Sequence, residues 1–242
     1  VLLEGVFEPE EYAEVERLGL WPVVGSQWQL ESLLRRDWKT PVTVWLKMDS
    51  GMHRAGFFPH NFAAAHTALM QSGKVAAVVK TSHFACADEE ERGMTDMQIE
   101  TFDLACAALA GEESLANSAA ALAYPQARRD WGRAGLALYG VDPFLEKDPR
   151  FKPVMRLVTE IFGERVLQPH EPIGYGASFY TKRSTRVGLA AAGYADGYPR
   201  RAATGTPVAV EGRRSRILGR VSMDMLTVEL ADNEGFGSEV EL

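Results

Sequence analysis

The first half of the chain alternates short apolar runs with stretches of helical period. The clearest run is Val42–Met48, which is β-branched, aromatic or aliphatic at nearly every position and is typical of a strand buried on both faces. The other predicted strands are Val1–Leu3, Pro22–Val24, Val75–Phe84, Leu115–Ala119 and Gly135–Tyr139, and the predicted helices are Gln27–Arg36, Pro59–Gln71 and Thr95–Leu109. This alternation predicts an α/β fold, either part of a (β/α) barrel or a doubly wound sheet.

Two of the predicted helices carry start signals. Ser26 is a good N-cap for the first helix, and Thr95 is the expected cap of the third. The apolar period of that third helix predicts that Met97, Phe102 and Leu104 are buried together with Ala105 and Leu109.

After Asp142-Pro143 the pattern changes. Prolines become frequent, the helical period ends, and short strand candidates follow at Leu157–Phe162, Thr185–Ala192, Thr206–Glu211 and Val221–Leu230. We therefore predict a partial (β/α) barrel over residues 1–148 and a mostly β domain over residues 149–242.

Composition narrows the functional classes. The net charge of -7 and the short, scattered basic clusters argue against a nucleic-acid partner. No apolar run reaches about 18 residues, so no membrane-spanning segment is predicted. The two cysteines, Cys86 and Cys106, form neither a CxxC pair nor a zinc set, so we predict no metal site and expect reduced thiols in a cytoplasmic protein.

Polar residues follow the predicted strands of the first half. Asp49 and Arg54 follow the central strand, and His83, Ser118 and Arg133 stand near the ends of later ones. In parallel α/β folds, active sites lie at the carboxyl ends of the strands. A single such residue is more often structural, but their recurrence at successive strand ends favours a site. Ser118 and the backbone of Gly135 and Leu136 suit a phosphate.

The second half holds three glycine-rich polar stretches. They contain Tyr175 between two glycines, Tyr194 in a loop with Asp196, and the pair Met223-Asp224. Tyrosines in such turns often only anchor hairpins. The glycines around Tyr175 nevertheless leave its phenol uncrowded, as an acid/base group requires.

Taken together, these stretches resemble the motifs of alanine racemase, a fold-type III enzyme that uses pyridoxal 5'-phosphate. LKMDSGMHRAG resembles the family's KxDTGMxRxG, and SHFACADE resembles its THFAxAD. ANSAA, GRAGLALYG, IGYGASFY, AGYADGYPR and GRVSMDM have counterparts in the same order. The resemblance covers nearly the whole chain and implies a TIM-type barrel followed by a mostly β domain.

The resemblance implies a role for each matching residue. Arg54 would bind near the cofactor's phenolic oxygen and the carboxylate of the substrate alanine, and Lys47 matches a lysine that is carbamylated in many members. His83, Ser118, Arg133, Gly135, Leu136 and Tyr194 would bind the cofactor, Tyr175 would be a catalytic base, and Met223 and Asp224 would line the substrate pocket. The family's sites are shared across a homodimer.

Chemical reasoning supports two of these roles. Racemisation needs acid/base groups on both faces of a planar intermediate, and Tyr175 suits one face if nearby cations lower its pKa from about 10. Arg133, with a pKa ordinarily above about 12, would not protonate the pyridine nitrogen, which restrains side reactions such as transamination.

Some residues depart from the family pattern. Ser50, Ala134 and Ser222 are mild replacements, but no segment resembles the family's KAxAYGHG motif, which holds the cofactor lysine. Both ends of the sequence fall in strand-like patterns, so we expect a piece of a longer chain that is inactive by itself. Two alternatives stay open, a racemase of broader amino-acid specificity and a fragment without turnover.

Overall fold

The computed structural model describes residues 1–144 and 148–242. One of the seven lysines of the sequence, Lys147, lies outside these ranges. The chain forms two compact units, Val1–Pro153 and Val154–Leu242. The change of pattern in the sequence predicts this boundary five residues earlier, between residues 148 and 149. Each unit is described by itself below.

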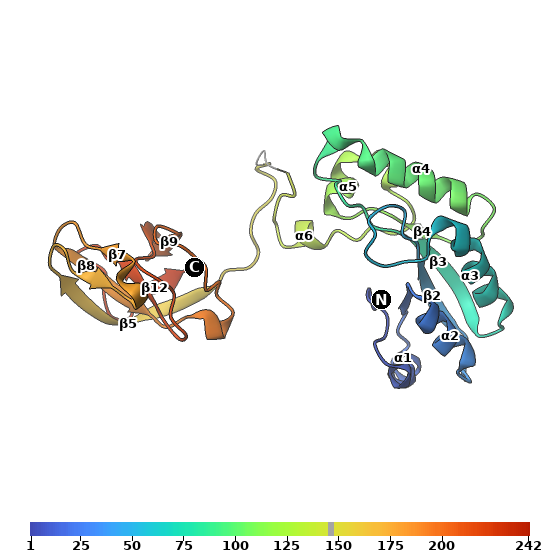
Figure 1. The fold of residues 1–242 in the computed structure, drawn as a ribbon, viewed down its shortest axis with the longest axis horizontal. Coiled ribbons are helices and arrows are strands. Elements are labelled where there is room, and N and C mark those ends of the chain that lie inside the picture. The colour runs from blue at the N-terminus through green and yellow to red at the C-terminus, as the bar shows by residue number, and fades with distance from the viewer. Residues whose placement is uncertain (145–147) are drawn as a thin grey trace. The chain divides into compact units, whose positions relative to one another are not determined.

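The first unit is an α/β structure (Figure 1). Its strands are β1 (Val23–Val24), β2 (Val42–Lys47), β3 (Val75–Thr81) and β4 (Glu113–Ser114). Its α-helices are α1 (Tyr12–Arg17), α2 (Gln27–Arg35), α3 (Pro59–Gln71), α4 (Met94–Cys106), α5 (Ser118–Ala123) and α6 (Gly135–Leu138). Short 3₁₀ turns lie at η1 (Pro9–Glu11), η2 (Glu90–Arg92) and η3 (Pro125–Ala127).

The four strands form one parallel sheet in the order β1-β2-β3-β4. Helices α2, α3 and α4 lie along one face of this sheet (Figure 1). Because all pairs are parallel, the carboxyl ends of the strands meet at one edge. The loops that follow β2, β3 and β4 therefore carry their side chains to the same place.

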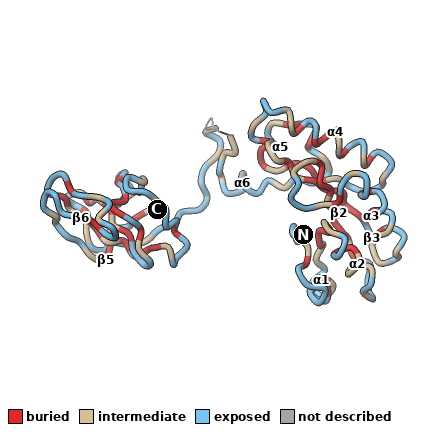
Figure 2. Tube along the Cα trace, viewed as in Figure 1, coloured by how far each residue is buried: buried red, intermediate tan, exposed pale blue. Residues whose placement is uncertain are grey.

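Both faces of the central strand are buried, as its composition predicts (Figure 2). Val44 and Leu46 belong to the main core with Phe62 of α3 and Phe102 of α4. Trp45 points the other way and packs in a second cluster with Val23, Val79 and Trp21. The alternation of side chains along a strand explains this division.

Helix α4 differs from its predicted form. Its N-cap is Gly93, which has a φ of 62°, whereas Thr95 lies inside the helix and is buried. Phe102 is fully buried, but Met97 and Leu104 are 66% and 74% exposed, so their predicted burial is wrong. These two residues are seven positions apart and therefore share the helix face opposite the core.

Two predicted strands are absent from the described residues. Leu115–Ala119 leaves the sheet after β4, and Asn117 caps α5 by accepting a hydrogen bond from the backbone N–H of Ala120 at 3.0 Å. Gly135–Tyr139 contains the short helix α6 instead of a strand. Short apolar runs are compatible with a strand or a helix. In Leu115–Ala119 the Asn117 cap favours the helix.

The second unit consists of β5 (Val158–Leu167), β6 (Pro172–Ile173), β7 (Phe179–Tyr180), β8 (Thr185–Ala190), β9 (Pro207–Val210), β10 (Arg213–Arg216), β11 (Leu226–Glu229) and β12 (Glu239–Glu241). Two 3₁₀ turns, η4 (Tyr175–Ala177) and η5 (Tyr194–Asp196), lie between strands. Six strands pair antiparallel in the order β10-β9-β12-β5-β8-β11, and β6 pairs with β7. A bridge between Ile217 and Val228 joins the two ends of the six-stranded order.

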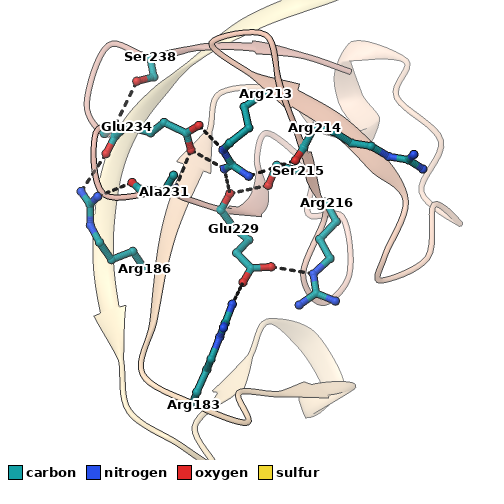
Figure 3. Close-up of polar contacts among 11 residues, drawn as sticks. Arg183, Arg186, Arg213, Arg214, Ser215, Arg216, Glu229, Ala231, Glu234 and Ser238 are labelled. Carbon is teal, nitrogen blue, oxygen red and sulfur yellow. Dashed lines mark hydrogen bonds and ion pairs between the residues drawn. The ribbon is translucent and has the colours of Figure 1, made fainter.

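The core of this unit is small and apolar, with Ile161, Val210, Val228 and Val240 among its fully enclosed members. A network of arginines and glutamates surrounds one end of the sheet (Figure 3). Arg213 donates two hydrogen bonds of 2.6 Å to the buried carboxylate of Glu234. Glu234 also accepts from the backbone of Ala231, and these contacts close the turn between β11 and β12.

In the part of the chain that the structure describes, no helix is long and apolar enough to cross a membrane.

Candidate active site

A cavity of about 470 Å³ opens in the first unit. Its lining includes residues from the carboxyl ends of β2 and β3 and from the segment that follows β4. All seven candidate residues of this unit line it, namely Lys47, Arg54, His83, Ser118, Arg133, Gly135 and Leu136. The parallel sheet thus brings together residues that are far apart in the sequence.

The loop that carries Arg54 is organised by the buried residue Asp49. Its carboxylate accepts hydrogen bonds from the backbone N–H groups of Gly51 at 3.1 Å and His53 at 2.9 Å, and the His53 ring lies 3.3 Å away. Burial opposes the charged carboxylate, but these hydrogen bonds and the His53 charge hold the pKa of Asp49 below its usual range. The charged carboxylate of Asp49 and the groups that bond it therefore all belong to the local sequence DSGMH.

Gly56 closes this loop against β2. It has a φ of 130°, and a Cβ at this position would lie 2.5 Å from the backbone nitrogen of Asp49. Phe57 then donates a backbone hydrogen bond to Lys47 at 2.9 Å. Only glycine permits this close return of the chain, which sets the position of Arg54.

Arg133 is held by the ends of β3 and β4. Its Nη1 donates to Thr81 Oγ1 at 3.2 Å and to the carbonyl and hydroxyl oxygens of Ser114 at 2.9 and 2.6 Å. Its Nη2 donates to the carbonyl oxygens of Ser82 at 2.6 Å and Leu115 at 3.2 Å. Burial lowers the pKa of Arg133 to about 10, so the side chain stays positive at neutral pH.

Among the described residues, the Nε–H of Arg133 has no partner, while both terminal nitrogens are fully engaged. The guanidinium is thus fixed in place with one donor free.

His83 accepts a hydrogen bond at Nδ1 from Arg133 Nη2 at 3.2 Å. Since arginine only donates, Nδ1 must be unprotonated and the ring carries its proton on Nε2. Burial lowers the pKa of His83 to about 4, and the charges of Arg133, Arg54 and Lys47 act in the same direction. The imidazole at this site is therefore neutral at physiological pH.

Ser118 begins α5, beside the amino end of α6. Its hydroxyl oxygen accepts from the backbone N–H of Ala137 at 3.0 Å, which leaves the O–H available to donate. The backbone N–H of Gly135 is bonded to the carbonyl of Arg133 at 2.9 Å in this structure. Ser118, Gly135 and Leu136 all line the cavity, although the backbone N–H of Gly135 already has a partner.

Lys47 lies at the end of β2 and faces two other cations of the cavity. Burial lowers its pKa; Glu4 and Asp49 oppose this effect, while Arg54 and Arg133 add to it. Lys47, Arg54 and Arg133 together outnumber the two acids of the lining, Glu4 and Asp88. This donor set attracts an anionic ligand.

The residues fit pyridoxal phosphate. A dianionic phosphate suits the hydroxyl donor of Ser118 and the excess of positive charge, and the free Nε–H of Arg133 suits a ring acceptor. A neutral His83 can lie against an aromatic ring without adding charge. The cavity volume of about 470 Å³ lies in the ordinary range for cofactor sites.

The second unit has its own cavity, of about 1020 Å³, which Tyr175 and Tyr194 line together with Arg200 and Arg220. Tyr175 is 72% exposed and stands between Gly174 and Gly176, which have φ angles of 69° and 73°. A Cβ at Gly176 would lie 3.4 Å from the Arg220 guanidinium, which places a cation beside the tyrosine turn. The Arg200 guanidinium lies 5.4 Å from the centre of the Tyr194 ring.

Met223 and Asp224 are not among the described residues that line this second cavity. The backbone carbonyl of Met223 accepts from Ala195 at 2.9 Å, and its side chain is 53% exposed. Gly193 lies against this carbonyl, since a Cβ there would be 2.1 Å from it. The loop of Tyr194 and the Met-Asp pair are thus packed together by their backbones.

The polar residues that hold Arg133 and the loops after β2 and β3 in place were not predicted from the sequence. Thr81, Ser82 and Ser114 bond Arg133, and Gln98 of α4 reaches the loops after β2 and β3. The only signal for such a residue is a polar side chain at a buried position. That position can be recognised only once the buried face of the helix is known.

The first unit is a parallel α/β segment with a cationic cavity at the carboxyl ends of its strands, and a β domain follows it. This arrangement is typical of a barrel-type enzyme that binds an anionic ligand. The family model "Alanine racemase, N-terminal domain" matches residues 1–143, and "Alanine racemase, C-terminal domain" matches residues 154–242. The alanine racemase of Neisseria meningitidis serogroup C is 69% identical over 243 residues, a match that covers 100% of this chain and 69% of that protein. The "Alanine racemase, catabolic" of Pseudomonas aeruginosa is 50% identical with the same coverage.

The solved structures agree. The crystal structure of the biosynthetic alanine racemase from P. aeruginosa matches with a TM-score of 0.91 and 44% identity, and the match covers 100% of this chain and 69% of that one. The alanine racemase from Bartonella henselae with covalently bound pyridoxal phosphate matches with a TM-score of 0.84 and 26% identity, over 100% and 68% of the two chains. The chain belongs to the alanine racemase family, whose members depend on pyridoxal phosphate.

Both the resemblance and the predicted fold class, a barrel-type domain followed by a mostly β domain, are thereby confirmed.

Proposed function

We propose that this chain supplies most of the active site of an enzyme that interconverts L-alanine and D-alanine with pyridoxal 5'-phosphate. The observation that carries the proposal is the convergence of Lys47, Arg54 and Arg133 with a neutral His83 on one cavity at the carboxyl ends of the strands. Family membership supports the same activity. The relatives include both a biosynthetic and a catabolic enzyme.

When bound, pyridoxal phosphate supplies an electron sink for the α-carbanion of an amino acid. Ser118 would hold the phosphate by donating its hydroxyl proton in a hydrogen bond, beside the Gly135-Leu136 segment. By likeness to the family, Tyr194 would help to hold the phosphate or line the entrance. Arg133 would donate its Nε–H to the pyridine nitrogen without protonating it, since its pKa of about 10 keeps the proton on the guanidinium. His83 would face the ring as a neutral imidazole.

Arg54 would bind the substrate carboxylate and the phenolic oxygen of the cofactor, and the Asp49 loop would orient it. We propose that Lys47 is a modification site as well. Its pKa is lowered, first by burial, so a larger share of the amine is neutral and able to react with carbon dioxide. A carbamate there would turn a repulsive neighbour of Arg54 into an attractive one.

Tyr175 is the proposed acid/base group on one face of the substrate, in a homodimer that shares its active sites. Tyr175, Met223 and Tyr180 expose 72%, 53% and 52% of their surfaces, and such exposed apolar side chains are typical of a surface that a partner covers. Met223 and Asp224 would line the substrate pocket of the partner's barrel. The cytoplasmic location expected from Cys86 and Cys106 stays a prediction.

The first test is racemisation of L-alanine by the purified protein with pyridoxal phosphate, measured as D-alanine formed. The second is intact mass before and after borohydride reduction, with peptide mapping of any reduced adduct. We expect none of the seven lysines of this sequence to be the attachment point, so the 242 residues alone should gain no stable adduct and show no turnover. An adduct mapped to Lys47 would contradict this, and a longer form with cofactor but without D-alanine production would overturn the proposed activity.

A further inference from the structure

Gln98 is a buried polar residue that none of the assigned roles uses. It lies in the second turn of α4, on the side of the helix that faces the sheet, and only 2% of its surface is exposed. Its Nε2 donates to Ser50 Oγ at 3.2 Å and to the His83 carbonyl at 3.0 Å, and its Oε1 accepts from the backbone N–H of Ala85 at 3.0 Å. Every polar atom of the amide is therefore bonded to a loop at the carboxyl edge of the sheet.

These contacts continue into a short network of hydroxyl groups. Ser50 Oγ lies 2.7 Å from Ser82 Oγ, and Ser82 Oγ in turn donates to the Met48 carbonyl at 2.9 Å. A Cβ at Gly51 would lie 3.4 Å from Gln98 Cγ, so the loop passes directly over the side chain. Gln98 and the two serines thus join the loop after β2 to the loop after β3.

The same two loops place the charged groups of the cavity. The loop after β2 carries Arg54, and the loop after β3 carries His83 together with the Ser82 carbonyl that accepts from Arg133. A buried amide is costly to leave unbonded, so the loops are held wherever Gln98 can satisfy its hydrogen bonds. Movement of residues 82–85 would shift two acceptors of Arg133, the Ser82 carbonyl and His83 Nδ1.

We propose that Gln98 is a positioning residue of the racemase site, which fixes His83 relative to Arg133 and Arg54 through the backbone of the loops after β2 and β3. Gln98 is not among the described residues that line the cavity, so it would act through the loops alone. The effect of Gln98 on the position of His83 is expected in the protein without cofactor. Only its effects on cofactor affinity and on kinetics rest on the proposed function.

The test compares the wild-type protein with Gln98→Met, which keeps the length of the side chain and removes all three hydrogen bonds. Ser50→Ala is a milder second variant, because it removes one partner and leaves the bonds to His83 and Ala85. Thr101→Ala is the matched control on the same helix, since within residues 1–144 and 148–242 the Thr101 hydroxyl bonds only the carbonyl of Met97, at 2.8 Å.

The first readout is the NMR titration of the His83 ring in the cofactor-free protein. Lys47 from β2, Arg54 from the following loop and Arg133 from the segment after β4 are the charged groups that face this ring. If residues 82–85 relax outward in Gln98→Met, the His83 pKa moves from about 4 toward its ordinary value by roughly one unit. Ser50→Ala should give a smaller shift in the same direction, and Thr101→Ala none.

The second readout needs turnover and therefore uses a form of the protein that carries the family's cofactor-lysine motif. In that form the cofactor dissociation constant should rise about tenfold in Gln98→Met, with kcat for alanine falling more than KM rises. A folded Gln98→Met protein whose His83 titration and cofactor affinity match the wild type would overturn the proposal. If Gln98→Met does not fold, an unshifted His83 in Ser50→Ala overturns it in the same way. A wild-type form that carries the cofactor-lysine motif and still binds no pyridoxal phosphate would refute the proposed function instead, since the His83 titration does not need the cofactor.

Discussion

The neutral state of His83 predicts a specific dependence of stability on pH. Burial and three neighbouring cations lower its pKa from 6.5 to about 4 in the folded first unit. The unfolded chain has an ordinary histidine in its place. Between these two values the unfolded state binds a proton that the folded state does not bind.

The sign and the size follow from this difference. Because the unfolded state binds more protons, the free energy of unfolding falls as pH decreases from about 6.5 to about 4 and then levels off. A difference of about 2.5 pKa units, from 6.5 to about 4, corresponds to about 3 kcal/mol at most. Above pH 6.5 His83 is neutral in both states and no longer changes the free energy of unfolding.

The assay is urea unfolding of the wild-type protein and of His83→Gln at pH values from 4 to 8. Glutamine can accept from Arg133 but does not titrate. All five tryptophans, Trp21, Trp28, Trp38, Trp45 and Trp131, lie in the first unit, so tryptophan fluorescence reports the unfolding of this unit alone. Carboxylates titrate equally in both proteins and cancel in the difference.

We expect the free-energy difference between the two proteins to grow in favour of His83→Gln by about 2 to 3 kcal/mol between pH 7 and pH 4.5. Parallel stability profiles over this range would refute the reasoning. They would mean that the folded site accepts a proton on His83 despite Arg133.

Three further predictions concern other parts of the chain. Glu234→Gln should destabilise the second unit by about 1 to 3 kcal/mol in thermal unfolding followed by circular dichroism, because it weakens the paired hydrogen bonds from Arg213 (Figure 3); an unchanged transition would show that the pair is not stabilising. Gly56→Ala should cost at least about 1 kcal/mol in urea unfolding followed by tryptophan fluorescence, since its Cβ would meet the backbone of Asp49, and normal stability would contradict the close approach. In a form of the protein that carries the family's cofactor lysine, Tyr175→Phe should abolish exchange of the α-hydrogen with deuterated solvent for one alanine enantiomer and leave cofactor affinity nearly unchanged; equal exchange of both enantiomers would exclude Tyr175 as a base.

The sequence predicts the central elements of the first unit well. Val42–Met48 is buried on both faces, and the helix Pro59–Gln71 has its predicted bounds, because long apolar patterns depend little on their surroundings. The short segments Leu115–Ala119 and Gly135–Tyr139 are predicted wrongly as strands. In such short runs the local cap and the end of the neighbouring strand decide the conformation.

The burial of α4 shows a second limit. Its apolar residues occupy both sides of the helix, so the period alone does not tell whether Met97 or Ile99 faces the core. Only packing against the sheet selects the face with Ile99 and Phe102, and the same choice buries Gln98. The supporting network of the site therefore becomes visible only in the tertiary structure.

The sequence by itself determined the family, the cofactor and the identity of the residues that meet in the cavity, because each motif carries its own residue types and local turn. The Asp49 loop is an example, since its hydrogen bonds run between residues at most four positions apart. Only the tertiary structure decided the protonation of His83, the fixed guanidinium of Arg133 and the role of Gln98. These properties depend on burial and on partners between 13 and 52 positions away in the chain, and such distances close only when the parallel strands bring their carboxyl ends together.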